Sequence, residues 1–281
     1  MATAIVRDRF VGDEMARVMS QIMTIFVLVP IIAPSIGAVI LLGFDWPATF
    51  WFCAVVAVAV LAWSTRLRET LDPANVRSVE PRQVVASYRE VTTFPLTVGY
   101  TFATIFLQVG FTLYLASSEL IVSEIYDRPG QFPIVFGAVA ILFGISAFTN
   151  SRLVERLGME LIISRAIIAA LIGSAVLVAI AIAGSGRPNF FVFMALTGLV
   201  LAFFMLLMPN MNTTAMIPVG HIAGSASAFV SAVRIGVGAA IAGVLNQFVT
   251  DSVTPFAIFL FGAVSAMAIT VTVVRRQIAT A

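Results

Sequence analysis

Long stretches without a charged residue dominate this chain of 281 residues and restrict the folds that it can adopt. A helix that crosses a bilayer needs about 20 mostly apolar residues. The uncharged stretches cover residues 18–44, 46–65, 91–118, 129–151, 166–186, 188–233 and 252–274. Charged residues make up only 11% of the chain, against about 25% in soluble domains. The pattern therefore predicts an all-α polytopic membrane protein.

The stretch over residues 188–233 is too long for one crossing, because a single helix of that length would extend about 69 Å at 1.5 Å per residue. Pro218 and Gly220 supply a break, since proline removes a backbone donor and glycine adopts turn dihedrals at little cost. The next helix then continues past Arg234 to about Val249. With this break we expect about eight transmembrane helices.

The arginines mark the two sides of the membrane, and all 16 basic residues are arginines. Cytoplasmic connections carry an excess of basic residues. One set of alternate connections holds Arg7, Arg9, Arg17, Arg66, Arg68, Arg77, Arg82, Arg89, Arg152, Arg156, Arg165, Arg275 and Arg276. The opposite connections hold only Arg128 and Arg187. This bias predicts a multi-pass protein with both termini in the cytoplasm.

One long polar connection, residues 67–92, divides the helices into two groups. We interpret it as a cytoplasmic linker between two helices in residues 1–66 and six helices in residues 93–281. Six helices after a long central loop are typical of one half of a two-lobed transporter. Two helices before the loop then correspond to a remnant of the first lobe.

Several short motifs, spread along the chain, resemble one transporter family. They read AIVRDRF at residues 4–10, ARVMS at 16–20, APSIG at 33–37, NSRLVERLG at 150–158, PN at 209–210 and AGSASA at 223–228. In this order they resemble segments from the end of helix 4 to helix 11 of the Bcr/CflA drug-resistance branch of the major facilitator superfamily. The resemblance covers the chain as family helices 5 to 12.

This resemblance implies a major facilitator superfamily-like helical bundle, whose full members have about twelve helices. We therefore expect an N-terminally truncated form, from a mis-assigned start or a truncated gene, rather than a genuine eight-helix protein. The implied function is a secondary active multidrug efflux transporter of a bacterial inner membrane. It would export small amphipathic drugs in exchange for protons by alternating access. The alternative is a truncated, transport-inactive membrane fragment of such a transporter.

Arg234 is the strongest candidate for a functional residue. It follows the Pro218–Gly220 break by about 18 Å of helix, which places it near the middle of the bilayer. An arginine at that depth is costly unless it faces a wet cavity or a partner. No Asp or Glu lies at comparable depth in the sequence, and the resemblance implies a counter-charge in family helix 1. The alternatives are a snorkelling arginine or a purely structural ion pair.

Two further motifs take their candidate roles from the resemblance. Pro30, Pro34 and Gly37 resemble the helix 5 antiporter motif, which helps to seal one side of the cavity; the alternative is ordinary packing of a kinked helix. A short cytoplasmic loop with Asn150, Arg152, Arg156 and Gly158 resembles the second-lobe copy of a gating motif. The alternative for this loop is positive-inside anchoring alone.

Polar and aromatic side chains within the apolar helices are further candidates for substrate binding or coupling. Asn210 and Gln108 are expected to form interhelical hydrogen bonds or to line a cavity. Phe111 either lines a drug cavity or faces lipid. Glu119 is either a proton site at the cavity mouth or a solvated side chain. A row of small residues is expected to form a packing face of its helix, at Gly224, Ala228, Gly236, Ala240 and Gly243.

The composition argues against other classes of protein. The arginines form no run or helix face that would bind nucleic acid. Cys53 and His221 are the only residues of their types, so no Cys/His metal site is expected and no cofactor is implied. An intramembrane enzyme needs a nucleophile and base, or metal ligands, at one depth. An ion channel needs a ring of charges or a filter. The composition predicts the lipid bilayer as a partner, and the resemblance implies small amphipathic drugs and protons.

Overall fold

The computed structural model describes residues 39–66 and 81–279, together with residues 14, 18, 33, 36 and 37. Most of the predicted first helix, over residues 18–44, lies outside the described residues. The chain divides into two compact units, Met1–Ser78 with Phe136–Ile141, and Val79–Val135 with Leu142–Ala281. Each unit is described by itself.

In the first unit, α3 (Pro47–Ser64) is an apolar helix bounded by tryptophans. Its 18 residues extend about 27 Å, close to the thickness of the hydrocarbon core. Trp46 precedes the helix and Trp63 lies in its last turn, where indole rings favour the membrane–water interfaces. The Trp46 ring also packs edge-on against Phe50, with centroids 5.9 Å apart. These features suit a helix that crosses a membrane.

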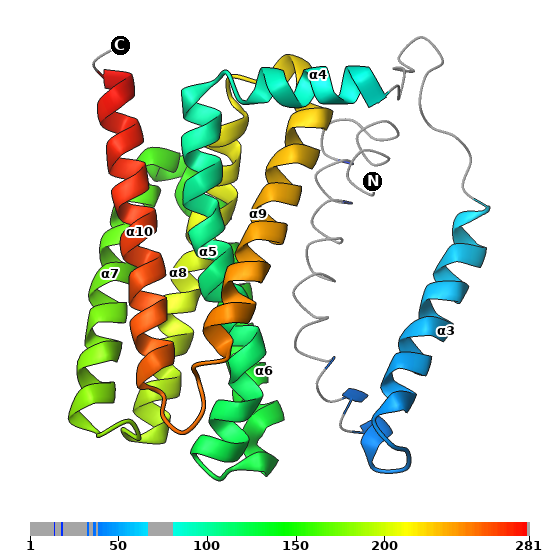
Figure 1. Ribbon diagram of the computed structural model, residues 1–281, viewed down its shortest axis with the longest axis vertical. Helices are drawn as coiled ribbons and strands as arrows, with labels where there is room; N and C mark the ends of the chain where they lie inside the picture. Colours follow the sequence, from blue (N-terminus) through cyan, green and yellow to red (C-terminus); the bar gives the residue numbers. More distant parts are fainter. Residues whose placement is uncertain are drawn as a thin grey trace. The chain divides into compact units, whose positions relative to one another are not determined.

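The second unit is built from long helices joined by short turns (Figure 1). The helices are α4 (Pro81–Val91), α5 (Pro95–Leu120), α6 (Phe132–Leu157), α7 (Met159–Ala183), α8 (Phe190–Met216), α9 (Ala223–Asn246) and α10 (Thr254–Ala279). A π-helical turn, Ile121–Ile125, extends α5, and 3-10 turns over Pro129–Gln131 and Gly220–Ile222 precede α6 and α9. Apart from α4, the helices lie side by side in the figure, as in a membrane bundle.

Seven helices within the described residues are long and apolar enough to cross a membrane. The predicted all-α polytopic fold is therefore confirmed, and the eighth expected helix falls on residues that are not described. The break that separates α8 from α9 lies between Met216 and Gly220, as the sequence predicts. Gly158 separates α6 from α7 with a φ of +75°, a left-handed conformation that glycine adopts without steric cost.

Helix α5 forms the centre of the second unit. It packs against α8, α9 and α10, while α7 packs against α8 and α10. Gly110 allows this close approach, because a Cβ at this position would lie 2.7 Å from Phe204 Cε2 and 2.9 Å from Leu260 Cδ1. Without water between helices, such close contacts carry much of the association energy in a bilayer.

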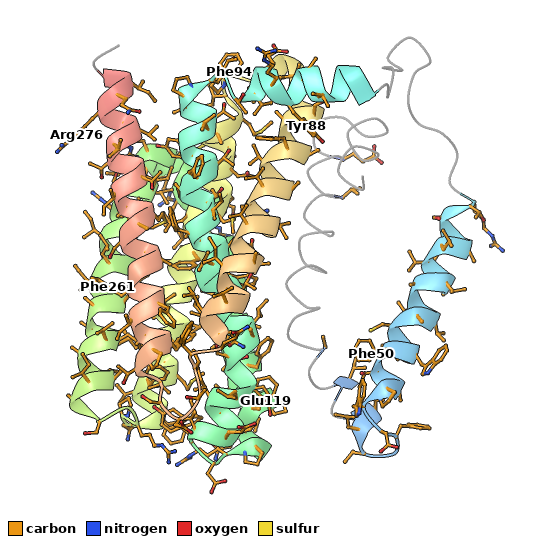
Figure 2. The ribbon with its side chains drawn as sticks, viewed as in Figure 1. Phe50, Tyr88, Phe94, Glu119, Phe261 and Arg276 are labelled. Atoms are coloured by element: carbon orange, nitrogen blue, oxygen red, sulfur yellow. The ribbon has the colours of Figure 1, made fainter. Side chains whose placement is uncertain are left out.

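Helix α4 occupies the second part of the segment that the sequence predicts as a linker, and the prediction did not anticipate it. Val91 at its end is fully buried against Val219, Ile222 and Ala226. The Tyr88 ring packs on Phe229 of α9, with centroids 5.3 Å apart, and Figure 2 shows Tyr88 beside the start of that helix. Among its charged residues this segment carries apolar side chains, including Tyr88 and Val91, that pack α4 against α9 and the turn before it.

Two arginines form contacts near the helix ends. Arg275 of α10 donates to Ser164 Oγ at 2.8 Å and lies 3.8 Å from a carboxylate oxygen of Glu160, both on α7. At the other end of the unit, the Arg128 guanidinium stacks 4.9 Å from the Phe190 ring centroid. Only Arg128 and Arg187 lie in the connections on this side of the predicted membrane. The cation–π contact gives a local reason for the presence of Arg128 there.

The packing at Gly110 predicts a specific loss of stability. Gly110→Ala should reduce the free energy of unfolding by about 1–3 kcal/mol, because overpacking forces neighbouring side chains to move. Thermal unfolding in detergent, followed by circular dichroism, measures the change. Gly262→Ala on α10 is the matched control, since a Cβ there meets nothing within 4 Å. Equal midpoint temperatures for the two variants would contradict this packing.

Candidate functional site

Arg234 lies in the middle of the span Gly224–Asn246. Its Nη1 donates hydrogen bonds to Gln108 Oε1 of α5 at 2.8 Å and to Met208 Sδ of α8 at 3.4 Å. Its Nε is buried and has no hydrogen-bond partner within the described part of the chain. The guanidinium therefore joins three helices, and both of its bonded partners are neutral.

Gln108 holds this arrangement through both ends of its amide. Its carbonyl oxygen accepts from Arg234, and its Nε2 donates to Thr112 Oγ1 at 2.9 Å, one turn further along α5. Gly238 makes room for it, because a Cβ there would lie 2.7 Å from both Cβ and Cγ of Gln108. The predicted choice between a hydrogen-bond partner and a cavity-lining group is thus resolved in favour of a partner for Gln108.

Asn210 forms a second polar contact between helices. Its Nδ2 donates to Asn150 Oδ1 at 2.6 Å and to the Leu206 carbonyl at 2.7 Å. Both asparagines are buried. We predicted Asn150 as part of the gate and Asn210 as a binding residue. In the structure these two side chains contact each other. The contact joins α6 to α8.

The segment predicted as a short cytoplasmic loop is helical instead. Asn150, Arg152 and Arg156 lie in the last turns of α6, and only Gly158 lies outside it. The helix continues because residues up to Leu157 keep their backbone hydrogen bonds until Gly158 adopts a positive φ. Arg152 stacks on Phe148 of the same helix, 4.5 Å from its ring centroid. Arg152 and Arg156 still lie near the end of a predicted membrane-spanning helix, as expected.

The remaining predicted residues lie apart from Arg234. The half-buried Phe111 packs on Phe143 of α6, with ring centroids 5.9 Å apart. Glu119 is exposed in the last turn of α5, and Figure 2 shows it at the end of the unit opposite α4. Pro30 and Pro34 lie outside the described residues. At Gly37 a Cβ would meet no described atom within 4 Å.

The predicted small-residue packing face of α9 is not covered by the other helices of the described unit, and its packing against another part of the protein stays a prediction. Each of its members is exposed within the described unit, at Gly224, Ala228, Gly236, Ala240 and Gly243. The covered face carries Ala226, Val230, Gly238 and Ala242, with Arg234 half-buried in the same row. Their spacing of four residues follows one face of a helix. That spacing from Arg234 is the signal that could have identified Gly238, whereas no local pattern points to Met208.

The Asn150–Asn210 contact can be tested by a double-mutant cycle. Asn150→Ala and Asn210→Ala should couple by about 0.6 kcal/mol, with an upper value of about 1.7 kcal/mol for hydrogen bonds between membrane helices. Unfolding titrations in a denaturing detergent give the four free energies. Asn150→Ala combined with Asn189→Ala is the control pair, because Asn189 caps the start of α8 through Phe191 N and Val192 N. That pair should be additive, and additivity of the first pair would disprove the contact.

Three known bacterial proteins are similar to this chain. The bicyclomycin resistance protein homolog of Haemophilus influenzae is 26% identical over 275 residues, covering 94% of this chain and 66% of the relative. The uncharacterized MFS-type transporter YdgK of Bacillus subtilis is 28% identical over 282 residues, with the same two coverages. The multidrug resistance protein MdtL of Escherichia coli is 38% identical over 84 residues, 30% of this chain and 22% of the relative.

The chain thus spans 66% of the length of the first two relatives. These matches confirm the resemblance to the drug-resistance branch that the motifs indicate. The sequence profile of the Major Facilitator Superfamily matches residues 1–243. With this match and its bundle of long apolar helices, the chain belongs to the major facilitator superfamily.

Proposed function

We propose that this protein is a secondary active multidrug efflux transporter. It exports small amphipathic drugs in exchange for protons, by alternating access of a site between two helix groups. Residues 1–66 belong to the first lobe, residues 67–92 connect the lobes, and residues 93–281 form the second lobe. Both termini face the cytoplasm of a bacterium, and the protein is not an enzyme.

The observation that carries the proposal is the position of Arg234 and its bond to Gln108. A charged side chain at mid-span is costly in hydrocarbon, and such residues face a wet cavity or the interior of a bundle. Arg234 is only partly covered by the described unit. A partly covered charge at this depth favours a wet cavity or the interior of the bundle over contact with hydrocarbon.

The surroundings of Arg234 suit an amphipathic substrate. Next to Gln108 on α5 and Arg234 on α9, the partly buried Phe106 and Val233 pack against a buried cluster of Ile105, Val109 and Ala263 from α5 and α10. Sites for small molecules combine apolar walls with a few polar groups that set orientation. The names of two relatives, a bicyclomycin resistance protein homolog and a multidrug resistance protein, support drugs as substrates. Exchange for protons rests on the resemblance alone.

Other residues take roles in this proposal from their positions. Asn150, Arg152 and Arg156 close the end of α6, where they would form a cytoplasmic gate with Gly158 as the turn. Asn210 fixes the gate segment to α8, and Phe111 contacts substrate. Glu119 takes up protons at the opposite end, and Pro30, Pro34 and Gly37 seal the first lobe against the second.

Drug accumulation in a bacterium that lacks its own efflux pumps tests this function. The 281-residue chain should lower the accumulation of fluorescent amphiphiles from a panel of cationic, neutral and anionic dyes. An uncoupler that collapses the proton gradient should restore it. Arg234→Ala should restore accumulation at equal expression, because the mid-span charge is lost.

Arg187→Ala is the matched control, since Arg187 is exposed in the turn between α7 and α8. It should export like the unchanged chain. Accumulation equal to that of the empty vector, with the protein present in the membrane, would contradict the proposal and favour a transport-inactive membrane protein. Export that persists in Arg234→Ala would contradict the role of this residue alone.

A further inference from the structure

The charge of Arg234 is not neutralised within the described protein. Its hydrogen-bond acceptors are an amide oxygen and a thioether sulfur, at Gln108 and Met208. The ion pair of Arg275 with Glu160 lies at the end of α7 and α10 and does not involve Arg234. Among the described residues, the side chains bonded to Arg234 therefore leave its positive charge uncompensated in an apolar setting.

The acidic residues of the described spans lie far from this depth. Glu124 lies in the π-helical turn that ends the span Pro95–Ile125, and Glu119 lies less than two turns before that end. Glu155 is near the end of α6, and Glu160 is in the first turn of α7. None of these lies near the middle of its span, where Arg234 and Gln108 are.

Part of the guanidinium remains available to a ligand. Arginine carries five N–H donors in a planar fork, and the two hydrogen bonds of Arg234 both use Nη1. Within the described residues Nη2 forms no hydrogen bond. Unlike Nε, it is not one of the fully buried atoms without a partner. Nη2 is thus the donor that an incoming group can reach.

The chemistry of this position selects for an anion. A carboxylate bound to a guanidinium forms charge-assisted hydrogen bonds, which are about twice as strong as neutral ones. The same bond in a low-dielectric setting also removes an uncompensated charge. A cationic group at this position would instead meet a like charge, which costs free energy.

We propose that Arg234 binds the carboxylate of an amphipathic, anionic substrate, whose apolar part lies along α5 and α9. This inference rests on the proposed transport function and names the substrate class of its site. Gln108 is a positioning residue: its oxygen is engaged by Nη1, and its bond to Thr112 sets the orientation of the amide. Arg234 therefore presents Nη2 in one direction.

Direct binding to the purified full chain in detergent tests the inference without any need for transport. The probes share one apolar skeleton and differ in their polar group: naphthylacetate, naphthylacetamide and naphthylethylamine. Radiolabelled naphthylacetate is measured by scintillation proximity, with protein-free micelles as the blank, and the other two probes compete with it. We expect the carboxylate to bind about tenfold or more tightly than the amine, as a charge-assisted bond predicts.

Variants assign the preference to Arg234. Arg234→Gln should lose about tenfold or more of the affinity for naphthylacetate and leave the affinity for naphthylethylamine unchanged or improved. Arg234→Lys should keep part of the preference, because it keeps the charge but loses the planar fork. Arg187→Gln is the control and should bind as the unchanged chain does. Size-exclusion profiles and helicity show whether each variant is folded.

Three outcomes would overturn the inference: no binding of naphthylacetate by the unchanged chain, equal affinity for the carboxylate and the amine, or an undiminished preference in folded Arg234→Gln. Its failure can be distinguished from failure of the transport function. Carboxylate binding without export would contradict only the transport proposal. Export of cationic and neutral dyes, without a preference for the carboxylate, would contradict only the substrate class.

Discussion

In a bilayer each backbone amide and carbonyl must find its partner inside the protein, because no water is present to replace it. This constraint makes the described long apolar segments helical and leaves side chains to join one helix to another. Glycine then decides how close two helices come. Gly110 brings α5 against α8 and α10, and Gly238 brings α9 against Gln108. The hydrogen bond between Arg234 and Gln108 depends on that approach.

The interhelical polar contacts have different consequences. Asn150 and Asn210 satisfy each other in a buried setting, so their bond stabilises α6 against α8 and leaves no charge behind. Arg234 has its Nη1 satisfied, but within the described part of the chain its charge is not compensated and its buried Nε has no partner. Arginines at membrane depth are retained where function requires them. For this reason the proposed transport site is centred on Arg234 rather than on the asparagine pair.

Sequence patterns predicted the helices and their ends well, and the contacts between helices poorly. The break at Pro218 and Gly220 was predictable because both residues act on the local backbone. The gate segment was misjudged as a loop, since charges at Arg152 and Arg156 suggested an early end to α6. Helix α4 was not predicted, because the charged residues of its segment indicated a polar linker, although Val91 at its end packs in an apolar cluster. Within the described unit the close contact of α9 is made at Gly238, and no local pattern distinguished this glycine from Gly236 or Gly243.

By itself, the sequence determined which segments cross the membrane, where they break, and that Arg234 lies at mid-span without an acidic residue at its depth. Hydrophobic length and charge are local properties, so one helix at a time can be recognised. Only the tertiary structure decided that Gln108, 126 positions away, is the partner of Arg234, and that Asn150 meets Asn210. These pairings depend on the rotation of each helix about its own axis. Packing against several neighbours sets that rotation, and no single segment encodes it.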